Sequence, residues 1–413
     1  MELNTNVPTI RFNGFDDQWS LVKLGKISST FTDGDWIESK DQSSEGIRLV
    51  QTGNIGVNKF INKENTTKWI SFETFNKLKC KEIFEGDILI SRLPEPAGRS
   101  TILPRLKTKA ITSVDCTIVR LKDEYTNTFI NQFLSTNNYF KRVNNLLAGG
   151  TRQRISRSNL YHIDFFICSK IEQTQIGNFF KTLDSQINSQ EQKHQKLINL
   201  KRAMLEKMFP KEGADLPEIR FKGFTEKWEE KKLGDVVEFY SGLTYSPKDV
   251  KDSKHTLVLR SSNVKNNNIV LNDNVYVDNN VINSSNVKKG DIIVVVRNGS
   301  RNLIGKHAEI KAEMPNTVIG AFMTGVRYNI SNFLNAILDS NRFTIEIEKN
   351  LGATINQITN GSFKAMLFRF PSLEEQQKIG EYFEKLDNLI QKSQVQIGKY
   401  KNIKQALLQK MFV

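Results

Sequence analysis

The chain consists of two copies of one sequence pattern, and this duplication limits its possible folds more than any other feature. The segment that begins at Pro8, PTIRFNGFDDQWSLVKLGKI, returns at Pro217 as PEIRFKGFTEKWEEKKLGDV, a shift of 209 residues. A second block, IGNFFKTLDSQI from Ile176, returns from Ile379 as IGEYFEKLDNLI, a shift of 203 residues. Solenoids need many short repeats, whereas one large duplication predicts a pseudo-twofold molecule with two halves.

The segments between the matching blocks differ from one half to the other. Residues 21–168 and 230–370 contain short β-type runs, namely GDILISR from Gly86, DCTIVRL from Asp115, LVLRSSNV from Leu257 and GDIIVVVR from Gly290. Polar stretches rich in Asn, Gly and Ser separate these runs, as is typical of strands joined by long loops. We therefore expect an α+β fold in which the loops of each half carry its recognition residues.

Each half ends in a long predicted helix. Residues 172–208 contain no proline and only one glycine. A serine three residues before a glutamate, Ser169 with Glu172 and Ser372 with Glu375, fits the capping box that begins many helices. Helices of about 37 residues, at about 1.5 Å each, would be rods of roughly 55 Å.

Both predicted helices carry one apolar stripe of the heptad type, which favours pairing of the two helices along it. Lysine interrupts the stripe at matching positions, Lys201 and Lys404. An amphipathic helix in the core of each half is the alternative, because it would show a similar stripe. The candidate helix-pairing residues are Ile176, Phe180, Leu183, Ile187, Leu197, Met204, Met208, Ile379, Phe383, Leu386, Ile390, Ile397, Tyr400, Leu407 and Met411.

The charge balance favours a polyanionic partner. The 413 residues include 59 Lys and Arg against 45 Asp and Glu, a formal net charge of +14. Nucleic acid is a better match than a membrane, because no apolar run approaches the roughly 18 to 20 residues of a spanning helix. The start, MELNTNVPTIRF, lacks the layout of a signal peptide, and Cys80, Cys116 and Cys168 form no CxxC pair, so we expect a cytoplasmic protein.

The usual catalytic motifs are absent from the sequence. The nearest approach to a phosphate-binding loop, GSRNLIGKH from Gly299, has the wrong glycine spacing and places His307 where Ser or Thr must bind magnesium. The four histidines never fall at HExxH spacing, and no Cys/His cluster suits zinc. The chain also contains no Pro-Pro, which excludes the Asn-Pro-Pro-aromatic loop of adenine methylation. The sequence therefore predicts neither an active site nor a metal site.

Two other functional classes stay open. Asp291, Glu309 and Lys311 echo the Asp…Glu-x-Lys layout of some magnesium-dependent nucleases, although charged residues flank most exposed strands. A stand-alone nuclease would use these three residues. A purely structural coiled-coil adaptor would need only the helices and would bind no DNA.

Recognition residues are expected in the polar loops of both halves. Guanidinium groups fit phosphate oxygens and the O6/N7 edge of guanine, and Asn and Gln amides fit adenine. Trp19 and Trp228, in the repeated blocks, are expected to pack the N-terminal segment of each half rather than to stack on bases. The candidate DNA-binding residues are Arg92, Arg99, Arg105, Lys107, Arg152, Gln153, Arg154, Arg157, Arg260, Asn263, Arg297, Asn298, Arg301, Lys306, Asn356 and Gln357.

The order of motifs resembles the DNA-specificity subunits of type I restriction-modification systems. The motifs are PEIRFKGFTEKWEEKKLGDV, the GDIIVVVR strand, NLGATINQITNGSF, and PSLEEQQKIGEYFEKLDNLI at the start of a long helix. The resemblance extends over nearly the whole chain and occurs twice. One departure is the entry of the first helix, CSKIEQT, which lacks the proline and one acidic residue of PSLEEQQ, so that the two helices are expected to dock a partner differently.

The resemblance implies an architecture and a set of partners. It implies two α/β target recognition domains, residues 1–168 and 212–371, separated by two long antiparallel coiled-coil helices, residues 169–211 and 372–413. Each domain would read one half of a split site on double-stranded DNA, and rods of about 55 Å exceed one turn of the duplex, roughly 34 to 36 Å. Two methyltransferase subunits would dock on the helices, and restriction subunits with ATP-driven translocation can join them. This chain would bind no cofactor, since S-adenosylmethionine, ATP and magnesium would belong to the partners.

Overall fold

The chain divides into two compact units that differ from the two sequence copies. The computed structural model describes residues 6–150, 153–352 and 356–413. Unit 1 comprises Met1–Glu191 together with Val395–Val413, and unit 2 comprises Gln192–Gln394. The helix α5 (Lys170–Lys207) begins in unit 1 and ends in unit 2, whereas α10 (Leu373–Met411) begins in unit 2 and ends in unit 1. Each unit therefore contains a part of both long helices.

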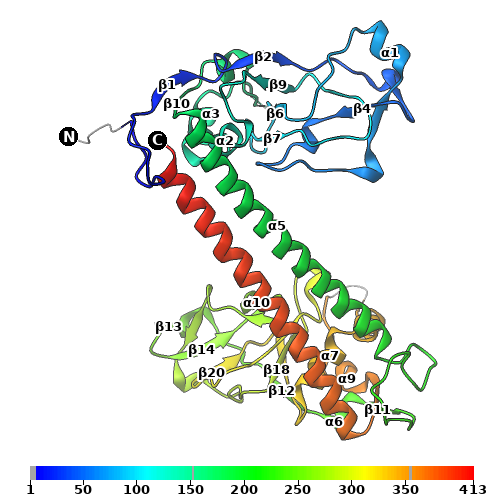
Figure 1. The fold of residues 1–413 in the computed structure, drawn as a ribbon. Helices are drawn as coiled ribbons and strands as arrows, with labels where there is room; N and C mark the ends of the chain where they lie inside the picture. Colours follow the sequence, from blue (N-terminus) through cyan, green and yellow to red (C-terminus); the bar gives the residue numbers. More distant parts are fainter. Residues whose placement is uncertain (1–5, 151–152, 353–355) are drawn as a thin grey trace. The chain divides into compact units, whose positions relative to one another are not determined.

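Unit 1 is built on a two-stranded ribbon and two four-stranded sheets (Figure 1). The ribbon is the antiparallel pair β1 (Ser20–Lys23) and β10 (Asp164–Ile167). The first sheet has the order β2 (Ser28–Asp33), β9 (Cys116–Leu121), β6 (Ile88–Ser91) and β7 (Ser100–Ile102), all antiparallel. The second has the order β3 (Gln42–Ser43), β5 (Lys68–Ile70), β4 (Ile47–Val50) and β8 (Ala110–Thr112), with β4 and β8 parallel.

Unit 2 repeats this topology strand for strand. Its ribbon is β11 (Glu229–Lys232) with β22 (Leu367–Phe370). Its first sheet has the order β12 (Glu238–Ser241), β21 (Met323–Arg327), β18 (Ile292–Val295) and β19 (His307–Glu309). Its second has the order β13 (Val250–Lys251), β17 (Val275–Val277), β14 (Thr256–Leu259) and β20 (Thr317–Ile319), and a small pair, β15 (Val264–Lys265) and β16 (Asn268–Ile269), is added.

Short helices complete each unit. Unit 1 contains α1 (Phe72–Lys77), α2 (Asn127–Phe133), α3 (Asn137–Asn145) and α4 (Arg157–Tyr161). Unit 2 contains α6 (Leu233–Val236), α7 (Ser331–Asp339), α8 (Asn341–Asn350) and α9 (Asn360–Ala365). In the part of the chain that the structure describes, no helix is both long enough and apolar enough to cross a membrane.

The continuous apolar runs GDILISR and GDIIVVVR form strands that are buried on both faces. Side chains alternate across a strand, so Ile88 and Ile90 of β6 join the cluster that contains the helices, and Leu89 joins the cluster beneath the second sheet. In β18, Ile292 joins the cluster that contains the helices of unit 2, and Ile293 joins the cluster beneath its second sheet. A strand covered on both sides needs apolar residues at every position, which explains why neither run alternates with polar residues.

The long helices begin where the sequence predicts, but the capping box is only half formed. The Glu172 and Glu375 backbone N–H groups each donate to the serine three residues earlier, at 3.4 Å. The two glutamate carboxylates do not reach back to the serines. Instead, Arg11 donates to Glu172 at 2.6 and 2.8 Å, and Arg220 donates to Glu375 at 2.7 Å through both nitrogens. Bidentate, charge-assisted hydrogen bonds are stronger than a cap, so the arginines hold the carboxylates.

Within each unit, the two helix segments run antiparallel and bury their stripes together. In unit 1, Lys404 contacts Asp184 and Lys401 contacts Glu191, an order that only antiparallel helices allow. The stripe residues in the core of unit 1 are Ile176, Phe180, Leu183, Ile187 and Met411, and those in the core of unit 2 are Met208, Ile379, Phe383 and Leu386. Ile397 is also buried, and the half-buried members are Leu197, Met204, Ile390, Tyr400 and Leu407.

The end of one long helix packs against the N-terminal segment of each unit. Trp19 and Trp228 are both 2% exposed, which confirms that these indoles pack the protein interior. The centres of the Phe412 and Trp19 rings are 6.4 Å apart in unit 1, and those of the Phe209 and Trp228 rings are 5.9 Å apart in unit 2. The duplicated blocks therefore form equivalent corners of the two units.

Candidate nucleic-acid interface

Backbone hydrogen bonds show which side chains of the two units occupy equivalent positions. In unit 1, Arg92 N donates to Asp115 O at 2.9 Å, and Ile155 N donates to Arg92 O at 3.1 Å. The same pair of hydrogen bonds exists in unit 2, where Val296 N donates to Phe322 O at 3.0 Å and Ile358 N donates to Val296 O at 2.9 Å. Arg92 therefore corresponds to Val296, and Asp115 corresponds to Phe322.

Helix caps extend this correspondence to the following loop. Ser156 caps α4 by accepting from Asn159 N, and Thr359 caps α9 by accepting from Ser362 N, both at 3.0 Å. Arg157 and Asn360 are consequently the first residues of equivalent helices.

The residues around these caps correspond as well. Arg154 and Gln357 are both two residues before their cap. Strand pairing adds that Asp33, opposite Thr117, corresponds to Ser241, opposite Thr324.

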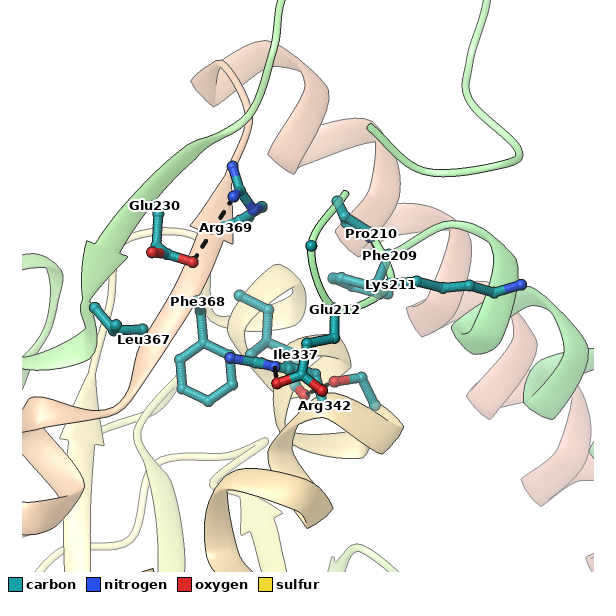
Figure 2. A pocket seen from close by; sticks show the side chains of 12 residues that line it. Phe209, Pro210, Lys211, Glu212, Glu230, Ile337, Arg342, Leu367, Phe368 and Arg369 are labelled. Carbon is teal, nitrogen blue, oxygen red and sulfur yellow. Dashed lines mark hydrogen bonds and ion pairs between the residues drawn. The ribbon is translucent and has the colours of Figure 1, made fainter. Parts of the chain in front are cut away.

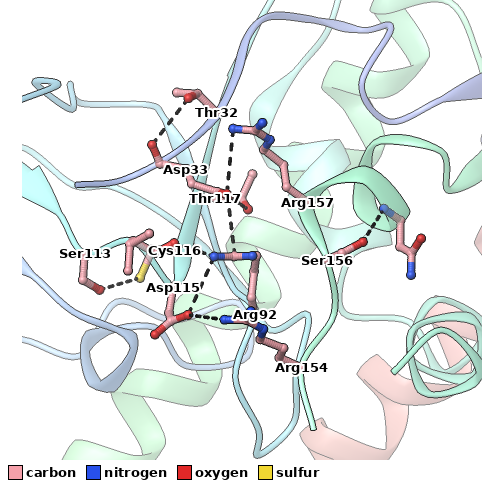
Figure 3. A network of polar contacts seen from close by, with 12 residues as sticks. Thr32, Asp33, Arg92, Ser113, Asp115, Cys116, Thr117, Arg154, Ser156 and Arg157 are labelled. Atoms are coloured by element: carbon pink, nitrogen blue, oxygen red, sulfur yellow. Dashed lines mark hydrogen bonds and ion pairs between the residues drawn. The ribbon is translucent and has the colours of Figure 1, made fainter. Parts of the chain in front are cut away.

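Unit 1 presents a charged network at this place, which we name the arginine surface: Asp33, Arg92, Asp115, Arg154 and Arg157 (Figure 3). Arg92 lies at its centre, with Nε 3.5 Å from Asp33 and Nη2 3.7 Å from Asp115. Arg154 Nη1 lies 3.9 Å from Asp115, and Arg157 Nη1 lies 3.8 Å from Asp33. Three guanidinium groups thus share two carboxylates.

The three arginines of this surface differ in their access to a ligand. The Arg92 side chain is only 10% exposed, and its Nη2 donates to Val114 O at 2.7 Å. The side chains of Arg154 and Arg157 are 61% and 49% exposed. The buried guanidinium and the two aspartates leave one net positive charge on the outer arginines, which favours an anionic ligand.

Unit 2 places neutral side chains at the equivalent positions: Ser241, Val296, Phe322, Gln357 and Asn360. We name Ser241, Phe322, Gln357 and Asn360, together with Arg297 beside Val296, the amide surface. The Asn360 amide donates to Ser241 Oγ at 3.0 Å. The Arg297 guanidinium lies 5.0 Å from the centre of the Phe322 ring, and Phe322 is 52% exposed. The backbone of Arg297 forms an antiparallel β-bridge with that of Gln357. An exposed ring under a guanidinium holds the charge by a cation–π contact without neutralising it.

Two further amides predicted to bind DNA shape the neighbouring loop. Asn298 Nδ2 donates to Ser261 Oγ at 3.1 Å, and Asn356 Nδ2 donates to Gly299 O at 3.0 Å. Asn298 N also donates to Asn356 O at 3.2 Å, so the two loops are joined beside the amide surface. Both side chains are half-buried.

Three of the residues predicted to contact DNA have polar groups that are bonded within the protein. Arg92 is buried, as described above. Arg99 donates to four backbone carbonyls, those of Thr52, Ile55, Leu93 and Pro96, at 2.6 to 3.0 Å, and burial lowers its pKa. Asn263 is 0% exposed, and its amide bonds Arg260 N and Val270 O at 2.9 Å.

The other predicted residues belong to neither named surface, and one of them lies outside the described residues. Arg260 pairs with Asp273 at 2.7 Å. Gln153, Arg105, Lys107 and Arg301 are exposed, and Lys306 is half-buried. Arg152 lies outside the residues that the structure describes. Sequence reasoning missed Asp33, Phe322 and Asn360, although Asn360 could have been found by aligning NQITN with QRISR across the 203-residue shift.

The nuclease alternative fails on the geometry of Asp291. Arg327 donates to this carboxylate through Nε at 2.9 Å and Nη2 at 3.2 Å, and Tyr240 Oη donates at 2.7 Å. In unit 1 the equivalent Asp87 accepts from Arg120 at 2.8 Å through both nitrogens. The duplicated ion pair identifies Asp291 as a structural residue.

Glu309 and Lys311 do not complete a metal site either. Burial raises the pKa of Glu309, whose carboxylate accepts a hydrogen bond from Ser331 Oγ at 2.9 Å. Asp291, Glu309 and Lys311 line one open cleft of about 900 Å³. Among the residues described, no group of three His, Cys, Asp or Glu side chains could hold a metal ion.

A smaller cavity in unit 2, of about 280 Å³, lies between the end of α5, β22 and the start of α8 (Figure 2). Its charged groups are paired with one another. Arg342 lies 3.3 Å from Glu212, and Arg369 lies 2.8 Å from Asp215 and 3.9 Å from Glu230. We therefore interpret this cavity as a gap between structural elements of unit 2 that ion pairs hold together, and not as a ligand site.

Comparison with known proteins agrees with the duplicated architecture. The sequence profile described as "Type I restriction modification DNA specificity domain" matches residues 17–199 and again 225–399. The chain is 26% identical over 173 residues to the StySPI specificity subunit of Salmonella potsdam, a match that covers 40% of this chain and 36% of that protein. It is 28% identical over 193 residues to the EcoKI specificity subunit of Escherichia coli (strain K12), covering 44% of this chain and 40% of that protein.

A solved structure extends the likeness to the whole fold. The type I restriction-modification S subunit from M. genitalium matches with a TM-score of 0.65 at 15% identity, over 98% of this chain and 99% of that one. The two sequence relatives are matched over less than half of their length. The family profile, by contrast, matches most of the present chain, once in each half. The chain therefore belongs to the family of type I restriction-modification DNA-specificity proteins.

Proposed function

We propose that this chain is the non-catalytic DNA-specificity subunit of a type I restriction-modification complex and reads a bipartite site on double-stranded DNA. The observation that carries the proposal is the pair of equivalent surfaces. One backbone frame, with the same strand order and the same helix caps, presents arginines in unit 1 and amides in unit 2. A protein that reads two different half-sites needs a shared frame with different side chains at the reading positions.

The charge of the chain supports the same function. A formal net charge of +14 provides the electrostatic attraction to phosphates that underlies all DNA binding. The candidate nuclease residue Asp291 is occupied by Arg327, and this removes the one catalytic constellation suggested by the sequence. We therefore assign recognition to this chain and catalysis to its partners.

The partners in this proposal are two methyltransferase subunits, one for each half of the duplicated chain, to which restriction subunits can be added. A solved structure that describes complex assembly and conformational transition of the type I restriction-modification system matches with a TM-score of 0.55 at 16% identity. S-adenosylmethionine, ATP and magnesium would be bound by the partner subunits. We place the complex in the cytoplasm, where cellular DNA is accessible to it.

Co-expression with the adenine methyltransferase encoded beside this chain, followed by mapping of methylated adenines, tests the proposal. We expect a split motif with two specific parts and a spacer of fixed length. A chain in which residues 230–370 replace residues 21–168 should methylate a motif that contains the second half-site twice. An unsplit motif, or the same motif from both chains, contradicts the proposal.

A further inference from the structure

We propose that Arg154 and Arg157 in unit 1, and Gln357 and Asn360 in unit 2, are the specificity-determining residues that make the two half-sites different. In this assignment, the arginine surface selects guanine in one half-site, and the amide surface selects adenine in the other. The inference rests on the proposed function and adds the chemical class of base that each unit reads.

The geometry of the arginine surface suits guanine. Each outer arginine is held by one carboxylate at 3.8 to 3.9 Å, so that its orientation is restrained while about half or more of the side chain stays exposed. Asp33 is itself fixed, because Thr117 Oγ1 donates to it at 2.9 Å. A restrained guanidinium can donate two parallel hydrogen bonds to O6 and N7 of guanine, two acceptors that no other base presents side by side in the major groove.

The amide surface has the donor and acceptor count that adenine requires. Asn360 donates one amide hydrogen to Ser241 Oγ at 3.0 Å, and its Oδ1 accepts from Thr324 Oγ1 at 2.9 Å. A side-chain amide has two hydrogens and two lone pairs, so one of each remains. Adenine presents the N7 acceptor and the N6 donor, which match this remaining pair. The two protein contacts also fix which end of the amide faces the ligand.

Gln357 offers the same chemistry on a side chain one methylene longer than that of Asn360. Its backbone is paired with Arg297, and it corresponds to Arg154 in unit 1. Two residues before the cap, unit 1 has Arg154 where unit 2 has Gln357. One residue after the cap, unit 1 has Arg157 where unit 2 has Asn360. Both exchanges replace a two-donor group with a donor–acceptor group at an unchanged backbone position.

The test transfers the residues of unit 2 into unit 1 in the full chain, co-expressed with the adjacent methyltransferase. The variant Arg154→Gln/Arg157→Asn should alter the specific part of the motif read by unit 1 and leave the other part unchanged. Methylation of the original half-site should fall roughly 10- to 100-fold, the discrimination that one or two bidentate base contacts provide. The matched control is Lys77→Gln/Lys122→Gln, which removes two positive charges from exposed lysines of unit 1 that are not among the candidate DNA-binding residues, and it should leave the motif unchanged.

A second variant separates base reading from attraction to phosphate. Arg154→Lys/Arg157→Lys keeps both charges but loses the planar fork, so we expect DNA to be methylated with a relaxed first half-site. This result supports the inference even if the Gln/Asn variant methylates nothing. An unchanged motif from the lysine variant or from the Gln/Asn variant overturns the inference. A wild-type chain without a split motif overturns the proposed function instead, so the two failures are distinguishable.

Discussion

The Lys404 ammonium lies 2.6 Å from the Asp184 carboxylate and joins α10 to α5 inside unit 1. The equivalent lysine of unit 2, Lys201, lies 2.5 Å from Asp387 and 2.6 Å from Asp339. These lysines are the polar residues that interrupt both apolar stripes in the sequence. They are explained by carboxylates that face them from the neighbouring helix segment, and Asp339 adds a connection to the end of α7.

Loss of the Lys201 ammonium should destabilise unit 2. Lys201→Met leaves Asp339, with a 9% exposed side chain, and Asp387 close together without their shared cation. We expect a loss of about 3 kcal/mol in the free energy of unfolding, as for other buried pairs that lose one partner. Urea unfolding followed by circular dichroism measures it. The control is Lys211→Met, whose side chain is 60% exposed and pairs with Glu218 on the surface, and loss of this pair should lower the free energy of unfolding far less. Equal midpoints for the two variants would contradict the role of the buried lysine.

Two glycines of α10 should respond to alanine with opposite signs. A Cβ on Gly380 would lie 2.2 Å from Asn332 Oδ1 and 2.7 Å from Phe333 N, so Gly380→Ala should cost about 1 to 3 kcal/mol. A Cβ on Gly398 would meet nothing within 4 Å, and Gly398→Ala should stabilise the helix by up to about 1 kcal/mol. Thermal melting of the two variants provides the comparison. An unchanged or raised melting temperature of Gly380→Ala would show that α10 does not approach α7 this closely, and a lowered one of Gly398→Ala would contradict the open space at that position.

The stability of unit 2 should fall in acid because of Asp339. Burial alone would raise the pKa of this carboxyl, but His307, 3.2 Å away, and the Lys201 ammonium lower it to about 2. A carboxyl with a depressed pKa in the folded state contributes stability that is present above its unfolded pKa of 3.8 and is lost as the pH falls through its folded pKa. We therefore expect the stability advantage of the wild type over Asp339→Asn to shrink by about 2 kcal/mol between about pH 5 and about pH 2. Urea midpoints of both proteins across this range measure the effect, and a constant difference would rule out the coupling.

DNA binding by the assembled complex should weaken steeply with salt. Each phosphate neutralised by lysine or arginine contributes about −0.9 to the slope of log affinity against log salt concentration. A chain with a formal net charge of +14 that reads a split site should give a slope steeper than about −3. Fluorescence anisotropy with a labelled duplex between about 50 and 200 mM salt measures the slope. A flat dependence, or no binding, would favour the structural adaptor.

The periodic and repeated features of the fold could be predicted from the sequence because they depend on local patterns. The stripe through Ile176 and its copy through Ile379 is a helical spacing, and the residues are buried as such a spacing requires. The division of the chain into units was harder to foresee. It depends on helix ends such as Phe209 and Phe412, each of which packs with the other copy's N-terminal segment.

The roles of individual arginines could not be predicted, because their partners are distant in sequence. Arg92 and Arg99 stand in a basic run that reads as a DNA contact. Arg92 is neutralised by Asp33 from another strand, and Arg99 is held by carbonyls 44 and 47 residues earlier. Asn360 escaped notice for a similar reason, since its partner Ser241 lies 119 residues away. An exposed arginine and a structural arginine look the same in a sequence, and only the partners that the fold brings to the guanidinium distinguish them.

Because each unit contains a part of both long helices, the two units are completed at different times during biosynthesis. Unit 2 is one uninterrupted stretch, Gln192–Gln394, whereas the core of unit 1 includes Leu408, Met411 and Phe412. A ribosome therefore completes every residue of unit 2 before it adds the last side chains that close unit 1. The half made first is finished last, and its open apolar core is the part of the nascent chain that depends most on chaperones.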